Sequence, residues 1–280
     1  MSGTLVRTRN VLKSWLLLIG ACAVFSLPGI TFGNYRLLSI LVFAALLLAT
    51  GLYVYSDRVA LGMVGAKELV QGEAPALHST VERLAARAGV AKPRLYVMRD
   101  GFPRALVAGR GPRGSALAVS RGLLSAMTPA ELEGVLAHEL AHLRNRDVLL
   151  QTTVSVLAAA VVEASRIGGW LERALLFVLG PVAAALVHLM LSPKREFWAD
   201  RLAAQICDSP HGLADALIRL EQASELVEFR ASPATEPLYT VNPFAEEGLA
   251  ALFVTHPSVA ERVQRLRALD PNWREKLRAA

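Results

Sequence analysis

The chain has 280 residues, of which 53% are apolar and only 19% are charged, a composition that argues against disorder and favours contact with lipid. Its 30 Lys and Arg outnumber its 24 Asp and Glu, but these basic residues do not gather into one stripe with interleaved aromatic residues, so no nucleic-acid partner is expected. The two cysteines, Cys22 and Cys207, lie far apart in unlike contexts, so a reducing compartment fits and no disulfide framework is implied.

Two long segments near the N-terminus carry no formal charge. Residues 14–35 form a run of 22 and residues 37–56 a run of 20, separated only by Arg36. Each is close to the ~20 residues needed to cross a hydrocarbon core, so residues 1–56 are predicted to form a transmembrane helical hairpin. The alternative is a cleaved signal peptide. It is disfavoured because only five apolar residues, Trp15–Ile19, precede the small residues, against ~7 to 15 in such a signal.

Basic residues before the first of these segments set its expected orientation. Arg7, Arg9 and Lys13 stand there without an acidic residue among them. Because cytoplasmic flanks of membrane helices are enriched in Lys and Arg, the N-terminus is predicted to be cytoplasmic. Two spans would then return the chain to the cytoplasm at Asp57.

The remainder divides into three predicted parts. Residues 57–147 and 194–280 read as the two pieces of one cytoplasmic domain, and residues 148–193 as a hydrophobic helical pair. In that pair the apolar run 174–193 is long enough to span a membrane, whereas the run 148–162 is marginal. A transmembrane pair and a merely membrane-associated pair both remain open.

The cytoplasmic domain is expected to be α+β and mainly helical, with a small antiparallel sheet. Apolar spacing predicts three amphipathic helices, Leu77–Gly89, Gly212–Arg230 and Ser258–Leu269. Short runs separated by Asp-Gly and Gly-Pro-Arg-Gly predict three strands, Arg94–Met98, Ala105–Ala108 and Ser115–Ser120.

The most informative segment is a helix with two histidines. Thr128 and Glu131 form a capping box that marks the start of this helix. His138 and His142 are four residues apart and share one face, so both imidazoles can reach one metal ion. Glu139 lies one turn before His142, where its carboxylate can reach a metal-bound water. This is the HExxH pattern of zinc proteases, although a helix with two histidines can also be a polar surface.

A second motif favours the metal site over the polar surface. In the segment Arg195–Asp200, Glu196 can supply a third ligand and Asp200 follows one helical turn later. A zinc-bound histidine almost always donates its other N–H to such a carboxylate. Two neutral histidines and one carboxylate leave the fourth position of a zinc ion for water, which is the catalytic arrangement. We therefore predict one catalytic Zn²⁺ per chain.

These motifs, the apolar pair between them, the N-terminal hairpin and Thr255-His256-Pro257 resemble the HtpX group of the M48 metallopeptidases. The resemblance runs from the first span to about Leu269. It implies a zincin-like metallopeptidase domain that faces the cytoplasm and cleaves membrane proteins in bacterial inner-membrane quality control. It further implies zinc ligands and a general base, namely His138, His142 and Glu196 with Glu139.

The same resemblance points to two more residues. The group has an acidic residue five positions after the second histidine, which corresponds to Asp147; the alternative is a charge at the end of a helix. Where the group usually has Pro-Asn-Ala-Phe, this chain has Pro103-Arg104-Ala105-Leu106. Because Arg favours carboxylates, the substrate preference is expected to differ.

An extended peptide substrate is expected to add to an edge strand, because strand addition reads the backbone and tolerates many sequences. The edge strand is predicted to be Ala116–Ser120. The predicted substrate-binding residues are Arg104, Ala105, Ala116 and Ala118.

Two residues near the C-terminus are predicted to stabilise the transition state rather than bind zinc. Pro257 fixes the chain after His256, and Arg262 lies one turn into the following helix. Hydrolysis builds negative charge on the carbonyl oxygen, and both residues can donate hydrogen bonds to it. The alternative is a helix-start turn in which Arg262 pairs with a surface carboxylate.

Together these features predict an integral membrane zinc endopeptidase that acts on unfolded or extended membrane proteins. Two alternatives remain. One is a CAAX-type prenyl-protein peptidase, which would share the zinc site but normally needs more membrane spans. The other is an inactive, zinc-stabilised membrane scaffold, which the intact HExxH motif disfavours.

Overall fold

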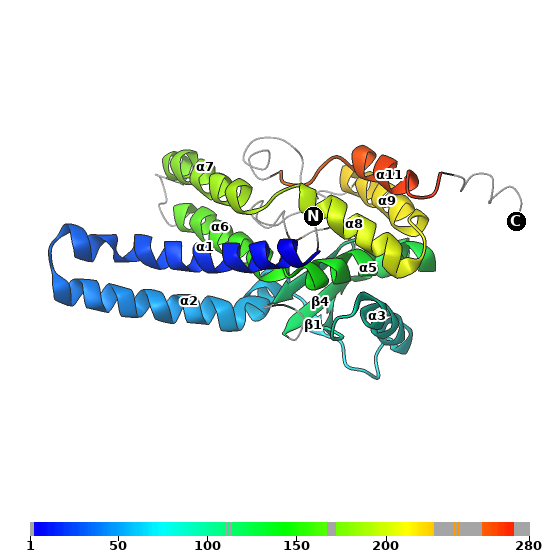
Figure 1. The fold of residues 1–280 in the computed structure, drawn as a ribbon, viewed down its shortest axis with the longest axis horizontal. Helices are drawn as coiled ribbons and strands as arrows, with labels where there is room; N and C mark the ends of the chain where they lie inside the picture. Colours follow the sequence, from blue (N-terminus) through cyan, green and yellow to red (C-terminus); the bar gives the residue numbers. More distant parts are fainter. Residues whose placement is uncertain are drawn as a thin grey trace, which may run out of the picture.

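The computed structural model describes residues 3–109, 111, 114–166, 172–226, 238, 240 and 254–271. Two pairs of long helices extend to one side of a body that contains the sheet and the shorter helices (Figure 1). The long helices are α1 (Gly3–Thr31), α2 (Tyr35–Met63), α6 (Val148–Arg166) and α7 (Glu172–Met190). The shorter helices are α3 (Pro75–Ala88), α4 (Arg121–Ala126), α5 (Pro129–Asn145), α8 (Lys194–Cys207), α9 (His211–Leu226) and α11 (Val259–Arg267).

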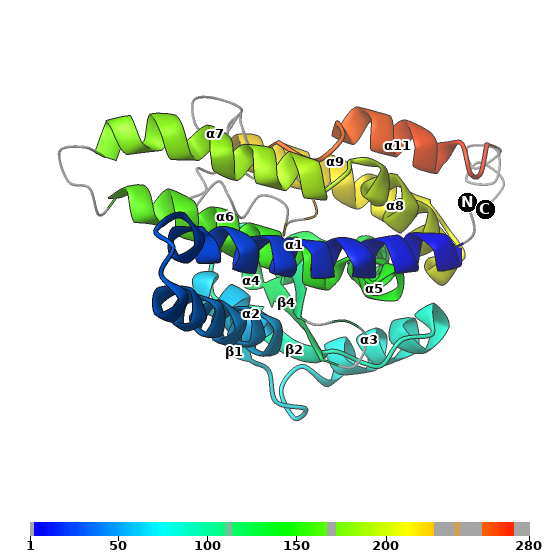
Figure 2. The ribbon, with the colours of Figure 1, turned by 60° about the vertical axis from the view of Figure 1, so that its left-hand side comes forward.

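The predicted N-terminal hairpin is a pair of antiparallel helices, α1 and α2 (Figure 2). The side chain of Asn34 caps α2 by accepting a hydrogen bond from the backbone N–H of Leu37 at 3.1 Å. The beginning of α1 is tied to the body, because the side chain of Asn10 donates to the carbonyl of Asn145 in α5 at 3.2 Å. Within the described ranges, no helix combines the length and the apolarity of a membrane span.

Most predicted elements lie close to their expected bounds. The helix predicted at 77–89 is α3, which ends at Gly89 in a left-handed conformation. The helices predicted at 212–230 and 258–269 are α9 and α11; residues 227–230 lie outside the described part of the chain. The apolar pair forms α6 and α7, and residues 167–171 between them also lie outside it.

The sheet is mixed, so the prediction of an antiparallel sheet was wrong. Its strands are β1 (Lys67–Glu68), β2 (Arg94–Met98), β3 (Ala105–Gly109) and β4 (Ser115–Ser120), in the order β1-β2-β4-β3. Strand β4 lies between β2 and β3. It pairs with β3 in the antiparallel direction and with β2 in the parallel direction. The short strand β1 was not predicted.

This strand order also overturns the predicted edge strand. The backbone of β4 pairs with β2 on one side and with β3 on the other. Ala116 is thus opposite both Arg94 and Ala108, and Ala118 is likewise flanked by two strands. A substrate cannot add to a strand that is already paired on both sides. Among the described strands, β1 and β3 form the edges.

Helix α5 is the central element of the body and contacts α3, α8, α9 and β3. The predicted capping box at its start is confirmed: Thr128 accepts from the N–H of Glu131 at 3.4 Å, and the Glu131 carboxylate accepts from the N–H of Thr128 at 2.7 Å. The same carboxylate accepts two hydrogen bonds from Arg219 of α9. The start of α5 is therefore fixed both locally and by its neighbour.

Helices α5 and α9 approach each other backbone to backbone at two glycines. A Cβ atom on Gly134 would lie 2.5 Å from the nitrogen of Leu213, and one on Gly212 would lie 2.3 Å from the carbonyl oxygen of Ala130. No flexible side chain can move aside at either contact. The small size of Gly134 and Gly212 therefore sets the distance between the two helices.

Replacing Gly134 by Ala should lower the free energy of unfolding by roughly 1–3 kcal/mol, the usual cost of overpacking, despite the better helix propensity of Ala. The matched control is Gly62→Ala in α2, where an added Cβ meets no atom within 4 Å. Thermal and denaturant unfolding of both variants measures the difference. If Gly134→Ala were as stable as Gly62→Ala, the backbone contact between α5 and α9 would be contradicted.

Candidate metal centre

Three buried side chains converge at the contact between α5 and α8. The Nε2 atoms of His138 and His142 lie 3.2 Å apart on α5. The Glu196 carboxylate on α8 lies 3.4 Å from Nε2 of His138 and 3.8 Å from Nε2 of His142. One potential ligand atom from each residue lies within 4.8 Å of the others, and all three residues are at most 2% exposed. The structure thus brings together the three ligands predicted from the sequence.

The chemistry of this donor set fits a metal cation. Neither carboxylate oxygen of Glu196 accepts a hydrogen bond of normal geometry from the described residues. A buried anion without such partners is costly, and each Nε2 atom offers a lone pair to a metal when the Nδ1 atom of the same ring carries the proton. A divalent cation would satisfy all three groups. Two imidazoles and one carboxylate are also the ligands of many catalytic zinc sites.

The Nδ1 atom of each histidine contacts a carboxylate. Nδ1 of His138 lies 3.0 Å from Asp200, which is one turn after Glu196 on α8. Nδ1 of His142 lies 3.1 Å from Asp147. An Nδ1–H that donates to a carboxylate leaves the Nε2 lone pair for a metal and fixes the orientation of the ring.

Asp147 reaches His142 because of the way α5 ends. Arg146 adopts a left-handed conformation with φ of 57° at the C-cap, which turns the chain back over the last turn of the helix. The N–H of Asp147 then approaches the carbonyl of His142 at 3.4 Å. Asp147 therefore lies just after the end of a helix, as the alternative of a helix-end charge expected. Its carboxylate also contacts the imidazole of His142.

Arg262, which was predicted to act at the transition state, makes its hydrogen bonds to other residues around the metal centre. Its guanidinium is fully buried and binds Asp200 through two hydrogen bonds, at 2.9 and 2.7 Å. A third hydrogen bond, 2.5 Å long, goes to the carbonyl of Thr240. Its Nη2 atom lies 3.5 Å from Nδ1 of His138 and 3.9 Å from the Glu196 carboxylate. Arg262 is therefore a positioning residue, which holds Asp200 and through it His138.

The electrostatics of the site favour ionised carboxylates. Burial alone would raise the pKa of Glu196, but His256, His142 and Arg195 hold this pKa well below its usual range. Burial would likewise raise the pKa of Asp200, and Arg262 lowers it. Burial disfavours a proton on His138, yet its hydrogen bonds to Asp200 and Glu196 outweigh that effect and raise its pKa to about 9. A metal cation would take the place of that proton.

The predicted general base, Glu139, has a partner that sequence reasoning missed. The hydroxyl of Thr240 donates to Oε1 of Glu139 at 2.8 Å. Thr240 thus connects Glu139 to Arg262, which binds its carbonyl. It comes from the segment between α9 and α11, and no motif in the sequence marks it. His256, predicted to act at the transition state, has its Nε2 atom 3.5 Å from Glu196.

The predicted substrate-binding residues do not form one surface. The guanidinium of Arg104 binds Asp100 at 2.7 Å and is only 8% exposed, so the carboxylate that it pairs with belongs to this chain. The expected change in substrate preference through Arg104 has no support in these contacts. Ala105 lies on the edge strand β3, while Ala116 and Ala118 lie on the internal strand β4.

The Asp200 carboxylate should contribute to metal affinity, because it fixes the ring of His138. Asp200→Asn should weaken metal binding by about 10- to 100-fold, as expected when such a partner of a ligating histidine is lost. Asp215→Asn, which removes a largely exposed ion pair with Arg267, is the matched control and should bind metal as the wild type does. Metal titration with a competing chelator measures both. Equal affinities in the two variants would contradict the role of Asp200.

Comparisons with known proteins agree with this site. The family model for peptidase family M48 matches residues 71–270. "Protease HtpX homolog" of Pelotomaculum thermopropionicum is 39% identical over 280 residues, covering 93% of this chain and 99% of the relative. The protein of the same name from Pyrococcus abyssi is 40% identical over 234 residues, covering 78% and 81%. A crystal structure of S. mikatae Ste24p aligns over 93% of this chain and 66% of its own, with a TM-score of 0.48 and 20% identity. At that distance the structural likeness carries no functional argument.

Proposed function

Since the chain belongs to peptidase family M48 and is a metalloprotease, we propose that it is a membrane-bound zinc endopeptidase that cleaves unfolded or extended membrane proteins. The observation that supports this proposal best is the buried donor set of His138, His142 and Glu196 with Glu139 beside it. An inactive scaffold would need only the ligands. It would have no use for a carboxylate placed next to them on the same helix.

The residues around the site divide the chemistry between them. A bound zinc ion supplies a polarising charge and lowers the pKa of a coordinated water towards ~7. The Glu139 carboxylate takes the proton from the attacking water and passes it to the leaving amine. The Thr240 hydroxyl holds that carboxylate in place. His256 is the remaining candidate for a hydrogen-bond donor to the charge that develops on the carbonyl oxygen.

The substrate backbone adds to β3 in this proposal. This strand lies at an edge of the sheet and contacts α5, the helix that carries Glu139. All five residues of β3 are buried, as are the metal ligands. Helices α2 and α6 also contact β3, so in this proposal a peptide reaches the strand only after one of these contacts has opened. Recognition through the backbone accepts many sequences, which suits a protease of unfolded proteins.

Glu139→Gln should abolish peptide hydrolysis and leave the bound metal in place, because Gln keeps the shape of Glu but cannot accept a proton at neutral pH. His138→Ala should lose both the metal and the activity. Glu133→Gln, on the same helix but paired with Arg83 at the surface, is the control and should cleave normally. Hydrolysis of a quenched peptide and metal analysis of the same samples decide the matter. Normal turnover by Glu139→Gln would remove Glu139 as the base.

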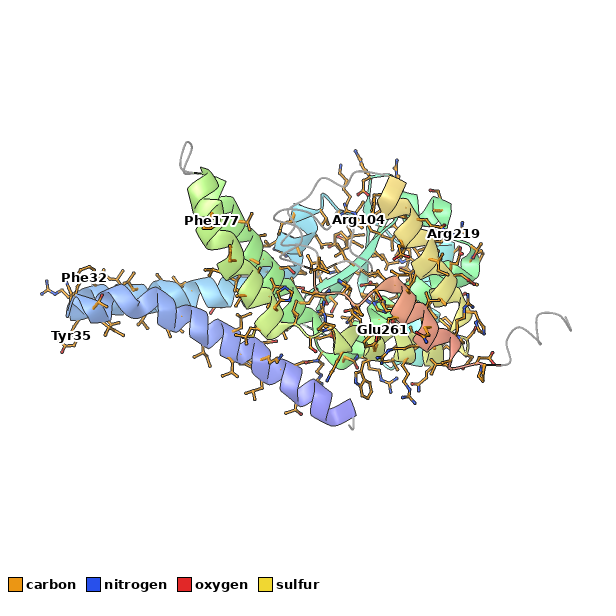
Figure 3. The ribbon with its side chains drawn as sticks, turned by 90° about the horizontal axis from the view of Figure 1, so that it is seen from above. Phe32, Tyr35, Arg104, Phe177, Arg219 and Glu261 are labelled. Carbon is orange, nitrogen blue, oxygen red and sulfur yellow. The ribbon has the colours of Figure 1, made fainter. Side chains whose placement is uncertain are left out.

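Attachment to a membrane is supported by the arrangement of the apolar helices. The α1–α2 hairpin and α7 extend from the same side of the body, with Phe32 and Tyr35 at the hairpin tip and Phe177 on α7, away from Arg219 and Glu261 (Figure 3). These aromatic side chains are highly exposed. We propose that this side enters the bacterial inner membrane, and that the N-terminus and the catalytic body are cytoplasmic because Arg7, Arg9 and Lys13 precede the first apolar run.

Cysteine labelling in intact cells tests this orientation. In a background in which Cys22 and Cys207 are replaced by Ser, a cysteine at exposed Ser79 of α3 should react with an impermeant thiol reagent only after the cells are permeabilised. A cysteine at exposed Phe32, at the hairpin tip, should react without permeabilisation. The reverse pattern would show that the catalytic body faces outward.

A further inference from the structure

A small cavity lies behind the metal centre, where five helices meet. It has a volume of about 100 Å³ and is lined by the beginning of α1, the end of α5, the beginning of α6, the end of α7 and the beginning of α8. This volume exceeds the ~10 to 15 Å³ that one water molecule requires on such a measure, so a group with several heavy atoms fits. The polar residues among its lining are Asn10, Lys13, Asn145, Asp147, Ser192, Lys194 and Arg195.

The charges of the lining favour an anion. Three of its residues are cations, namely Lys13, Lys194 and Arg195, and one is an acid, Asp147. The acid is already held by His142 at 3.1 Å. Lys13 is fixed at the cavity by its hydrogen bond to the carbonyl of Met190. A compact anion with several oxygen acceptors, such as a phosphate group, matches three cationic side chains with two amides and a hydroxyl, although one of these cations, Arg195, also contacts the Glu196 carboxylate.

The surroundings of the cavity indicate where such a phosphate comes from. Past Lys13, α1 exposes Leu16 and Ile19, and α7 exposes Leu189 just before the cavity. Two tryptophans with exposed side chains belong to this region: Trp198 lines the cavity, and Trp15 follows Lys13 by two residues on α1. Basic residues and Trp beside exposed apolar helices are typical of the boundary between a membrane and the cytoplasm.

We propose that this cavity binds the phosphate of an anionic phospholipid head group, with the acyl chains lying along the apolar surfaces of α1 and α7. The proposal rests on the membrane attachment proposed above. It gives the membrane a second point of contact with the catalytic body besides the hairpin itself.

Two residues of the cavity also touch the metal ligands. Asp147 contacts His142, and Nε of Arg195 lies 3.1 Å from the Glu196 carboxylate. A phosphate that holds Arg195 from the cavity side therefore fixes a neighbour of Glu196. The head group thus helps to order the metal centre where the protein meets the bilayer.

Native mass spectrometry of the full chain in detergent tests this site. The protein is titrated with phosphatidylglycerol or phosphatidylcholine, and the dissociation constant of the tightest lipid is measured. Wild type should prefer phosphatidylglycerol. In Lys13→Gln/Lys194→Gln the dissociation constant for this lipid should rise about 25-fold, because each lysine contributes roughly a factor of five to the affinity. Lys67→Gln/Lys92→Gln, which changes two lysines that do not line the cavity, should bind as wild type does.

A competition experiment with inorganic phosphate distinguishes a lipid head group from free phosphate. Millimolar inorganic phosphate should not displace phosphatidylglycerol. Displacement would show that the cavity takes free phosphate and would overturn the lipid assignment. Equal binding of both lipids, or unchanged binding by the Lys13/Lys194 variant at an unchanged melting temperature, would also overturn it. Failure of the membrane proposal itself would look different, because the wild type would then purify from the aqueous fraction without detergent.

Discussion

The contact between α5 and α8 is the constraint on which the metal centre depends. It holds the imidazole of His138 at both nitrogens by two residues of one helix: Glu196 faces Nε2 at 3.4 Å, and Asp200 faces Nδ1 at 3.0 Å. Because Glu196 and Asp200 are one turn apart, a shift of α8 along α5 would disturb both contacts at once. The glycine contact between α5 and α9 fixes α5 one turn before His138. The distances among the ligands therefore follow from helix packing rather than from loops.

The site concentrates charge where a fold selected for stability alone would place apolar side chains. Arg262 is fully buried, and Asp200, Glu139 and Glu196 are nearly so. Taking such groups out of water costs several kcal/mol for each ion, and replacing a buried ion pair by apolar residues is often stabilising. Arg262 offsets part of this cost by binding Asp200 twice. The arrangement is thus better explained by chemistry than by stability, and the lowered pKa of Glu196 keeps this ligand ionised.

Local signals in the sequence predicted much of this arrangement. The capping box located the start of α5, and the spacings of His138 with His142 and of Glu196 with Asp200 placed each pair on one helix face. Contacts between distant segments were not predictable in the same way. The sheet is mixed because β4 inserts between β2 and β3, and no residue of β4 encodes its neighbours.

The roles of single residues outside the motifs were also beyond the sequence. The pattern His256-Pro257 followed by Arg262 suggested two donors to the substrate, but Arg262 binds Asp200, which lies 62 positions earlier in the chain. Arg104 suggested a site for a substrate carboxylate, but the turn that contains it supplies Asp100. Thr240 carries no motif at all. In each case a partner that only the folded chain brings close decides what the side chain does.

We propose that His138, His142 and Glu196 together bind one zinc ion. X-ray absorption at the zinc edge, on the full chain purified without added metal, tests it most directly. We expect one zinc per chain, with two imidazole nitrogens at about 2.0–2.1 Å, oxygen ligands in the remaining positions and no sulfur. A sulfur ligand near about 2.3 Å, or a spectrum without imidazole scattering, would contradict it.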